Sequence, residues 1–188
     1  MSPTDNASKY LESALAALCR PGRWQEALDR LPVPTYTTNA EGEVTYWNKA
    51  CVEFAGREPE LGRDRWCVTW KLYTTTGKPL PHEDCPMAEA IKRKCEVRDE
   101  VAIALRPDGT RRAFVPYPTP LFDAIGELTG AVNLLIDVSD EQAVVLAEQA
   151  SRCVRLSKEI SSKADADLLA DLGAAYADMA AALRNTTC

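Results

Sequence analysis

The chain has 188 residues, of which 46% are apolar and 27% are charged, so it can bury one good core with some length left over. Its 28 acidic and 22 basic residues give a formal net charge of −6, and the lysines and arginines are scattered rather than clustered. Because binding of nucleic acid depends on a basic surface, we expect no direct contact with nucleic acid.

The amino-terminal sequence MSPTDNASKY lacks the basic flank and apolar run of an export signal, and no stretch approaches the roughly 18 apolar residues that span a bilayer. We therefore expect a cytoplasmic protein with no membrane contact. The seven cysteines are an odd number in a chain without an export signal, so reduced thiols are expected rather than a disulfide framework.

Two helices are predicted at the start of the chain. Residues 7–20 carry an apolar stripe at helical spacing, which includes Leu11, Leu15 and Leu18, and Pro21-Gly22 is a suitable stop. A shorter helix is expected between Trp24 and Leu31. Together these helices define an N-terminal helical extension, residues 1–31.

A β-hairpin and a capped helix are predicted next. The hairpin consists of strands 34–38 and 43–47 and the turn residues 39–42. Asn48 then stands at the N-cap position of a helix over residues 49–55, and Gly56 suits the left-handed residue after a helix end. Residues 57–81 show no pattern to which an element can be assigned.

The following segment is predicted to contain one helix and a three-stranded meander. Pro86 fits the first position of the helix. The strands are residues 97–105, 111–119 and 128–138, with a turn at 107–109. Pro116 and Pro118 lie two residues apart in the second of these strands, so both missing amides face the same neighbour, and we expect a bulge or a broken ladder there.

The last strand leads directly into a helix. Ser139-Asp140-Glu141-Gln142 has the pattern of a capping box, in which the Ser139 hydroxyl accepts from the third helical amide and Gln142 reaches back. A break is expected at residues 161–163. A final helix follows with apolar residues in alternating steps of three and four, the spacing of a seam that packs on another helix.

The order of these elements resembles the PAS domain family over residues 32–140. Two phrases carry the resemblance, NAEGEVTYWNKA at residues 39–50 and DVSD at residues 137–140, which is similar to the family's Asp-Val-Thr-Glu. The resemblance implies an α+β fold, a five-stranded antiparallel sheet with helices on one face and a small pocket between them. Residues 141–188 would be a C-terminal helical extension, and the role would be sensory or dimerising.

If the family's register holds, Ala131, Asn133 and Leu135 face the pocket. The predicted ligand-binding residues are Trp47, Met87, Ile91, Phe114, Asn133 and Leu135. Asn133 is the one polar group among apolar walls and needs a partner, because an unpaired buried amide costs about 1–3 kcal/mol. The alternative is that Asn133 bonds to a neighbouring element and the apolar residues are plain core.

A cofactor is not the expected outcome, although the sequence leaves one alternative. His82 is the only histidine, and it precedes the helix where haem-binding relatives carry their iron ligand, so a haem or metal redox or gas sensor using His82 or a cysteine is the competing reading. Cys67, Cys85 and Cys95 could add metal ligands, but no CxxC pair exists. The Asn-Cys-Arg-Phe-Leu phrase of flavin-binding relatives that form a cysteinyl adduct is missing.

We expect no enzymatic activity, because the helices after residue 140 contain no phosphate-accepting histidine and no P-loop glycine pattern. Output would then pass through contacts, in a homodimer or with a signalling kinase or regulator, and a small molecule in the pocket is a further candidate partner. The predicted interface residues are Leu11, Leu15, Leu18, Leu146, Leu169, Leu172, Tyr176, Met179 and Leu183. The alternative is that the terminal helices fold back on the same domain and only complete its core.

Overall fold

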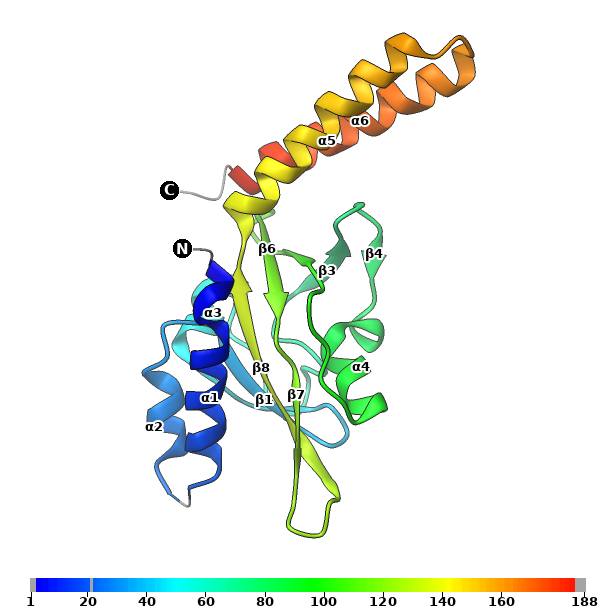
Figure 1. Ribbon diagram of the computed structural model, residues 1–188. Coiled ribbons are helices and arrows are strands. Elements are labelled where there is room, and N and C mark those ends of the chain that lie inside the picture. Colours follow the sequence, from blue (N-terminus) through cyan, green and yellow to red (C-terminus); the bar gives the residue numbers. More distant parts are fainter. Residues whose placement is uncertain (1–2, 21, 185–188) are drawn as a thin grey trace.

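The computed structural model describes residues 3–20 and 22–184, which form an antiparallel sheet with helices on both faces and a helical hairpin that projects from one end (Figure 1). The helical elements are η1 (Pro3–Asn6), α1 (Ala7–Leu18), α2 (Trp24–Asp29), α3 (Lys49–Ala55), η2 (His82–Asp84), α4 (Pro86–Arg93), α5 (Ser139–Glu159) and α6 (Lys163–Arg184). The strands are β1 (Thr35–Asn39), β2 (Val44–Trp47), β3 (Lys71–Thr74), β4 (Pro79–Leu80), β5 (Ala102–Leu105), β6 (Arg111–Pro116), β7 (Thr119–Phe122) and β8 (Leu128–Asp137).

The sheet has the predicted antiparallel α+β architecture, but with eight strands in place of five. Their order is β2-β1-β8-β6-β5-β3-β4, and β7 also pairs with β8. One reason is the predicted broken ladder: β6 ends at Pro116, Pro118 lies in the gap, and β7 resumes pairing at Thr119. The other is the β3–β4 hairpin, which lies within residues 57–81, where no element could be assigned.

The hairpin and the helix after it form as predicted, and Asn48 explains why. Its side-chain oxygen accepts from the backbone N–H of Cys51 (3.2 Å) and of Thr35 (3.0 Å), and its amide nitrogen donates to the carbonyls of Leu28 (3.1 Å) and Val33 (2.9 Å). One side chain thus caps α3 and ties it to β1 and to the end of α2. Gly56 ends α3 in the left-handed conformation, with φ of 65°.

Both faces of β8 are covered, which accounts for its long apolar run. Ala131 and Leu135 pack beneath α3 and α4 in the cluster on the inner face. On the outer face, Val132 and Leu134 pack against α1 and α2, whereas Ile136 lies in the cluster that includes residues of α5 and α6. The two helical extensions therefore complete the outer face of the sheet.

The predicted capping box at Ser139 is wrong. Ser139 is the first residue of α5, and neither its hydroxyl nor the Gln142 side chain caps the helix. The Ser139 hydroxyl instead accepts from the backbone N–H of Ala113 in β6 (3.0 Å) and donates to Asp137 (2.6 Å). Because β6 lies beside this junction, a buried strand amide takes the place of the helix amide, and Gln142 makes only the ordinary helical bond to Val138.

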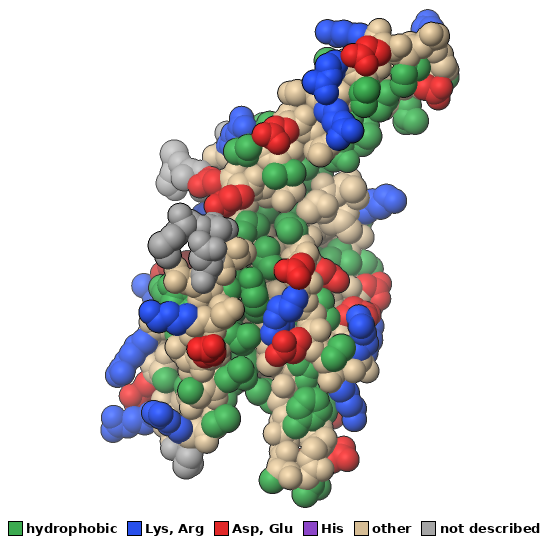
Figure 2. Space-filling model, viewed as in Figure 1, with side chains coloured by type: hydrophobic (Ala, Val, Ile, Leu, Met, Phe, Trp, Pro, Cys, Tyr) green, Lys and Arg blue, Asp and Glu red, His purple; other side chains and the backbone are tan. Residues whose placement is uncertain are grey.

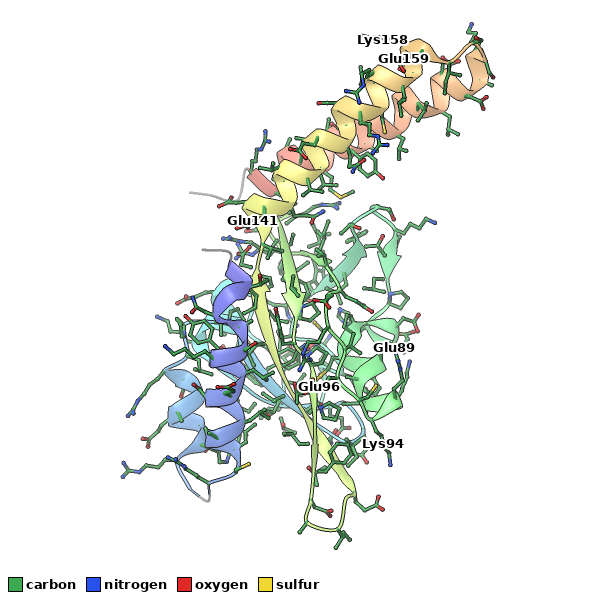
Figure 3. The ribbon with its side chains drawn as sticks, viewed as in Figure 1. Glu89, Lys94, Glu96, Glu141, Lys158 and Glu159 are labelled. Carbon is green, nitrogen blue, oxygen red and sulfur yellow. The ribbon has the colours of Figure 1, made fainter. Side chains whose placement is uncertain are left out.

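The predicted break separates α5 from α6, which run antiparallel as a hairpin (Figure 1). Figure 3 shows Glu141 at the root of this hairpin and Lys158 and Glu159 at its far end. The C-terminal half of α6 returns to the sheet, where Ala180 and Leu183 are buried. None of the helices in the described ranges has the length and apolar character that crossing a membrane requires.

Candidate functional site

The predicted pocket residues do come together, between the inner face of the sheet and helices α3 and α4. Met87 and Ile91 approach from α4, Phe114 from β6 and Leu135 from β8, and all four are buried in one cluster, with Trp47 partly buried at its edge. The ring of Phe114 meets that of Phe54 edge to face, with centroids 5.5 Å apart.

Asn133 lies on the inner face as expected, and its polar atoms are paired within the protein. Its amide nitrogen donates to the hydroxyl of Tyr36 (3.0 Å), and its oxygen accepts from the backbone N–H of Tyr117 (2.9 Å). The Tyr36 hydroxyl in turn donates to the carbonyl of Trp66 (2.9 Å). The amide thus links β1, β8 and the gap between β6 and β7, which is the alternative that the sequence had left open.

The interior leaves no space for a flavin or a haem. Tyr36, Met87 and Phe114 are fully buried side chains that occupy the space between sheet and helices, so a planar cofactor there would have to displace them. Because the Asn133 amide is already satisfied, it offers no orphaned group to a ligand. The residues present do not fit either cofactor.

Three cysteines belong to the same cluster. Burial raises the pKa of Cys51 and Cys67, and it raises the pKa of Cys85 to about 12. The thiol of Cys67 and the hydroxyl of Thr69 lie in hydrogen-bonding contact, with 3.1 Å between sulfur and oxygen. Thiols held in the protonated form are poor nucleophiles and poor metal ligands.

His82 lies outside this interior. Its ring lines two surface pockets, one of about 620 Å³ that also involves Arg57 and Asp64, and one of about 290 Å³ along the β3–β4 hairpin. Burial lowers the pKa of His82, which favours the neutral imidazole. This position does not favour the alternative in which His82 is the ligand of a haem in the interior. No group of three or more His, Cys, Asp or Glu side chains within residues 3–20 and 22–184 could hold a metal ion.

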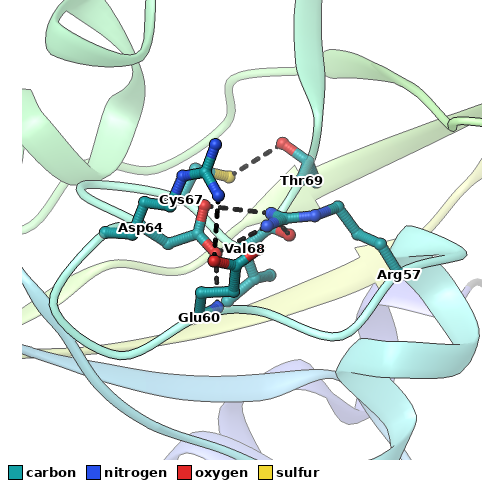
Figure 4. Close-up of polar contacts among 7 residues, drawn as sticks. Arg57, Glu60, Asp64, Cys67, Val68 and Thr69 are labelled. Atoms are coloured by element: carbon teal, nitrogen blue, oxygen red, sulfur yellow. Dashed lines mark hydrogen bonds and ion pairs between the residues drawn. The ribbon is translucent and has the colours of Figure 1, made fainter.

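The floor of the larger surface pocket is fixed by a paired arginine (Figure 4). Arg57 donates through both terminal nitrogens to the carboxylate of Asp64 (3.0 and 2.7 Å) and also to the carbonyl of Val68 (3.1 Å). Asp64 accepts in addition from the backbone N–H of Glu60. These bonds hold the 57–69 loop in place, and their charges are already paired.

The predicted interface residues are used largely within the chain. Leu11, Leu15 and Leu18 pack on the outer face of the sheet, and Leu146, Tyr176, Met179 and Leu183 pack in the cluster at the root of the hairpin. The spacing of the seam over residues 169–183 predicts contact with another chain or helix, and its second half meets α5 and the sheet. Leu172, at 41% exposure, remains at the surface, and Leu169 is half-buried.

The junction between β8 and α5 was identified from the sequence, but its anchoring was not. Asp137 accepts from the Ser139 backbone N–H (2.9 Å) and from Arg112 of β6 (2.9 Å), while the N–H of Val138 donates to Ala113 (2.9 Å). Together with the Ser139 hydroxyl, these bonds fix the start of α5 to β6. No signal in the sequence pairs residues 112–113 with residues 137–139, because the contact depends on strand register.

Comparison with known proteins identifies the domain. A family model described as the PAS fold matches residues 28–143. A search of curated proteins finds no match. The sequence therefore matches at the level of the family, over more than half of the chain.

Solved structures with similar folds are LOV proteins. An RNA-binding light-oxygen-voltage receptor has 22% identity and a TM-score of 0.51 and covers 71% of this chain, which spans only 38% of that receptor. The LOV protein of Rhodobacter sphaeroides has 16% identity and a TM-score of 0.45, covering 95% of this chain and 98% of its own. The LOV domain of the blue-light activated histidine kinase of Erythrobacter litoralis EL346 has 22% identity and a TM-score of 0.45, covering 58% and 98%.

At these identities the likeness shows the fold alone. The RNA-binding receptor lends no support to the expectation that nucleic acid is not a partner, and that expectation stays a prediction. The sheet order, the helices α3 and α4 over its inner face and the family match over residues 28–143 agree with one another. This chain belongs to the PAS fold family.

Proposed function

We propose that this chain is a signal-sensing adaptor that acts through protein–protein contacts rather than through catalysis. The observation that carries the proposal is the anchored junction at residues 137–139, where the central strand of the PAS sheet continues into the projecting α5–α6 hairpin. A strand and helix joined without a flexible linker move together, so a change in the sheet reaches the hairpin.

The coupling begins at Asn133. Its bonds to Tyr36 and Tyr117 tie β8 to β1 and to the segment between β6 and β7, so a shift of any one of these strands strains the others. Four residues further along β8, Asp137 binds Ser139 and Arg112. Packed interiors switch between discrete arrangements rather than deforming continuously, which suits transmission of this kind.

The output surface in this proposal is a distal patch on the hairpin, defined as Ile160, Leu168 and Leu172. Leu168 is 69% exposed, and Leu172 follows it one helical turn later. Figure 2 shows hydrophobic side chains gathered along one side of the hairpin. Leu168, at this exposure, contributes little to the chain's own core, and leucines at the surface of a projecting helix suit a partner such as a signalling kinase or regulator.

The input is assigned to contacts on the outside of the domain. A small molecule inside would have to displace Tyr36, Met87 or Phe114, whereas the helices that pack on the outer face of the sheet belong to the two helical extensions. A partner that shifts α1 or the root of α6 would act directly on β8.

Affinity purification of the tagged protein from its own host, with quantitative mass spectrometry, tests the distal patch. Leu168→Glu combined with Leu172→Glu should remove a signalling kinase or regulator that the wild type retains. Ala170→Glu combined with Ala174→Glu is the matched control, because both alanines are exposed on the same helix. Equal recovery of every protein with both double variants would refute an output through this patch.

A further inference from the structure

The turn between β7 and β8 presents an apolar tip at the end of the molecule opposite the α5–α6 hairpin (Figure 1). Ile125 is 84% exposed and Phe122 is 47% exposed. Turns of this kind normally carry polar residues, and an isoleucine so exposed adds nothing to the core of its own chain. Its presence therefore needs a reason outside the fold of one copy.

The tip is rigid. The side chain of Asp123 accepts from the backbone N–H of Ile125 (3.0 Å) and of Glu127 (2.9 Å), and the N–H of Asp123 donates to the Glu127 carbonyl (3.0 Å). Gly126 supplies the left-handed residue that the turn requires, with φ of 84°. A preformed tip loses little conformational freedom when it binds, which favours a role as an inserting element.

A pocket of about 460 Å³ lies between α1 and α2. Ala16, Ala17 and Ala27 leave space in its floor, and Trp24 forms a wall. The Trp24 ring is held in place by Tyr46, with ring centroids 5.1 Å apart. The remaining lining residues are Ser13, Arg20, Gly22 and Arg23.

The tip and the pocket are complementary in both apolar character and charge. The tip carries Ile125 between two acidic residues, Asp123 and Glu127, whereas the pocket is floored by small apolar side chains and rimmed by Arg20 and Arg23. We propose that a second copy of this chain fills the pocket, with the β7–β8 tip of each copy inserted between α1 and α2 of the other.

The arrangement of the fold permits a reciprocal contact. Figure 1 places the connected end of the α1–α2 pair and the β7–β8 turn at the same end of the molecule, side by side but separate. A two-fold axis through that end carries the tip of one copy to the pocket of the other and the reverse, which closes the assembly as a dimer. This contact goes beyond the proposed function, because the distal patch lies at the opposite end.

Sedimentation velocity over a concentration series tests the contact. The wild type should sediment as a dimer, and Ile125→Asp should raise the dissociation constant by about tenfold or more. Ala16→Phe, which fills the pocket from an exposed position on α1, should do the same. Leu61→Asp is the matched control, because Leu61 is also a large apolar residue at the surface, with 65% exposure, and belongs to neither the tip nor the pocket. This variant should leave the dissociation constant unchanged.

Mixing provides a second measurement. In a 1:1 mixture, the intact tip of the Ala16→Phe copy can enter the intact pocket of the Ile125→Asp copy. Each mixed pair thus keeps one of the two contacts, and the mixture should form dimers that neither variant forms alone. Glu127→Lys should also weaken association, and Arg20→Glu added to it should restore part of the loss.

A wild type that stays monomeric, a dissociation constant that Ile125→Asp leaves unchanged, or a mixture with no recovered dimer would each overturn the proposal. Circular dichroism of every variant confirms that the fold is retained. These results are independent of the distal-patch variants, so the two proposals can fail separately.

Discussion

Removal of one hydroxyl at the junction should weaken the whole domain. In Ser139→Ala, the buried N–H of Ala113 loses its acceptor at 3.0 Å, and an unpaired buried N–H costs about 1–3 kcal/mol. Asp137 keeps its bonds to the Ser139 backbone N–H and to Arg112, so no charge is orphaned. The better helix propensity of alanine returns up to about 0.5 kcal/mol. The free energy of unfolding should therefore fall by about 0.5–2.5 kcal/mol.

Thermal and urea denaturation followed by circular dichroism measure this change. For a chain of this size, each kcal/mol lowers the melting temperature by about 2–4 °C. Ser151→Ala is the matched control: its hydroxyl lies in the same helix, is exposed, and bonds only to Ala147 at 3.0 Å, so its change should stay within about 0.5 kcal/mol. A Ser139→Ala protein as stable as Ser151→Ala would refute the anchoring of α5 by β6.

Three other predictions concern the cysteines, His82 and Leu183. A thiol reagent with peptide mass spectrometry should modify the exposed cysteines in the native protein and the buried ones only after unfolding. The exposed cysteines are Cys19 and Cys95, and the buried ones include Cys51, Cys67 and Cys85. Burial lowers the pKa of His82 in the folded protein below the usual value of about 6.5, so the unfolded chain takes up a proton first as the pH falls. The free energy of unfolding should therefore decrease as the pH falls from about 6.5 toward the pKa of His82 in the folded protein, and His82→Gln should remove this decrease. Leu183→Ala should cost about 2–5 kcal/mol in urea denaturation, against less than about 0.5 for Leu168→Ala.

Local signals in the sequence predicted most of the fold. Asn48, whose side chain caps a helix, and Gly56, which adopts the left-handed conformation, mark the two ends of α3. Pro116 and Pro118, two residues apart and both without a backbone N–H, mark the gap between β6 and β7. The β3–β4 hairpin was missed because β4 has only two residues, one of them proline, and offers no alternation to detect. The Ser139 capping box failed because a tertiary contact to β6 competed with the local motif.

The sequence predicted which residues line the candidate site, but not that the site is filled by its own side chains. Residue types and register brought Met87, Phe114 and Asn133 to one interior, as expected from the family resemblance. That the interior is filled, and that Asn133 is paired with Tyr36 from a strand 97 residues away in sequence, depends on packing that no local pattern records. The apolar seam of α6 likewise predicts contact, but not whether the contact lies within the chain.

The central claim is that the state of the PAS sheet reaches the hairpin through the junction. Native-state hydrogen exchange of Asn133→Ala, corrected for its change in global unfolding free energy, measures this directly. The account predicts faster exchange at residues 139–150 and 176–184. Asn39→Ala, which disturbs only the β1–β2 turn, should leave those amides unchanged. Changes confined to the sheet in Asn133→Ala, with the hairpin as protected as in the wild type, would contradict the claim.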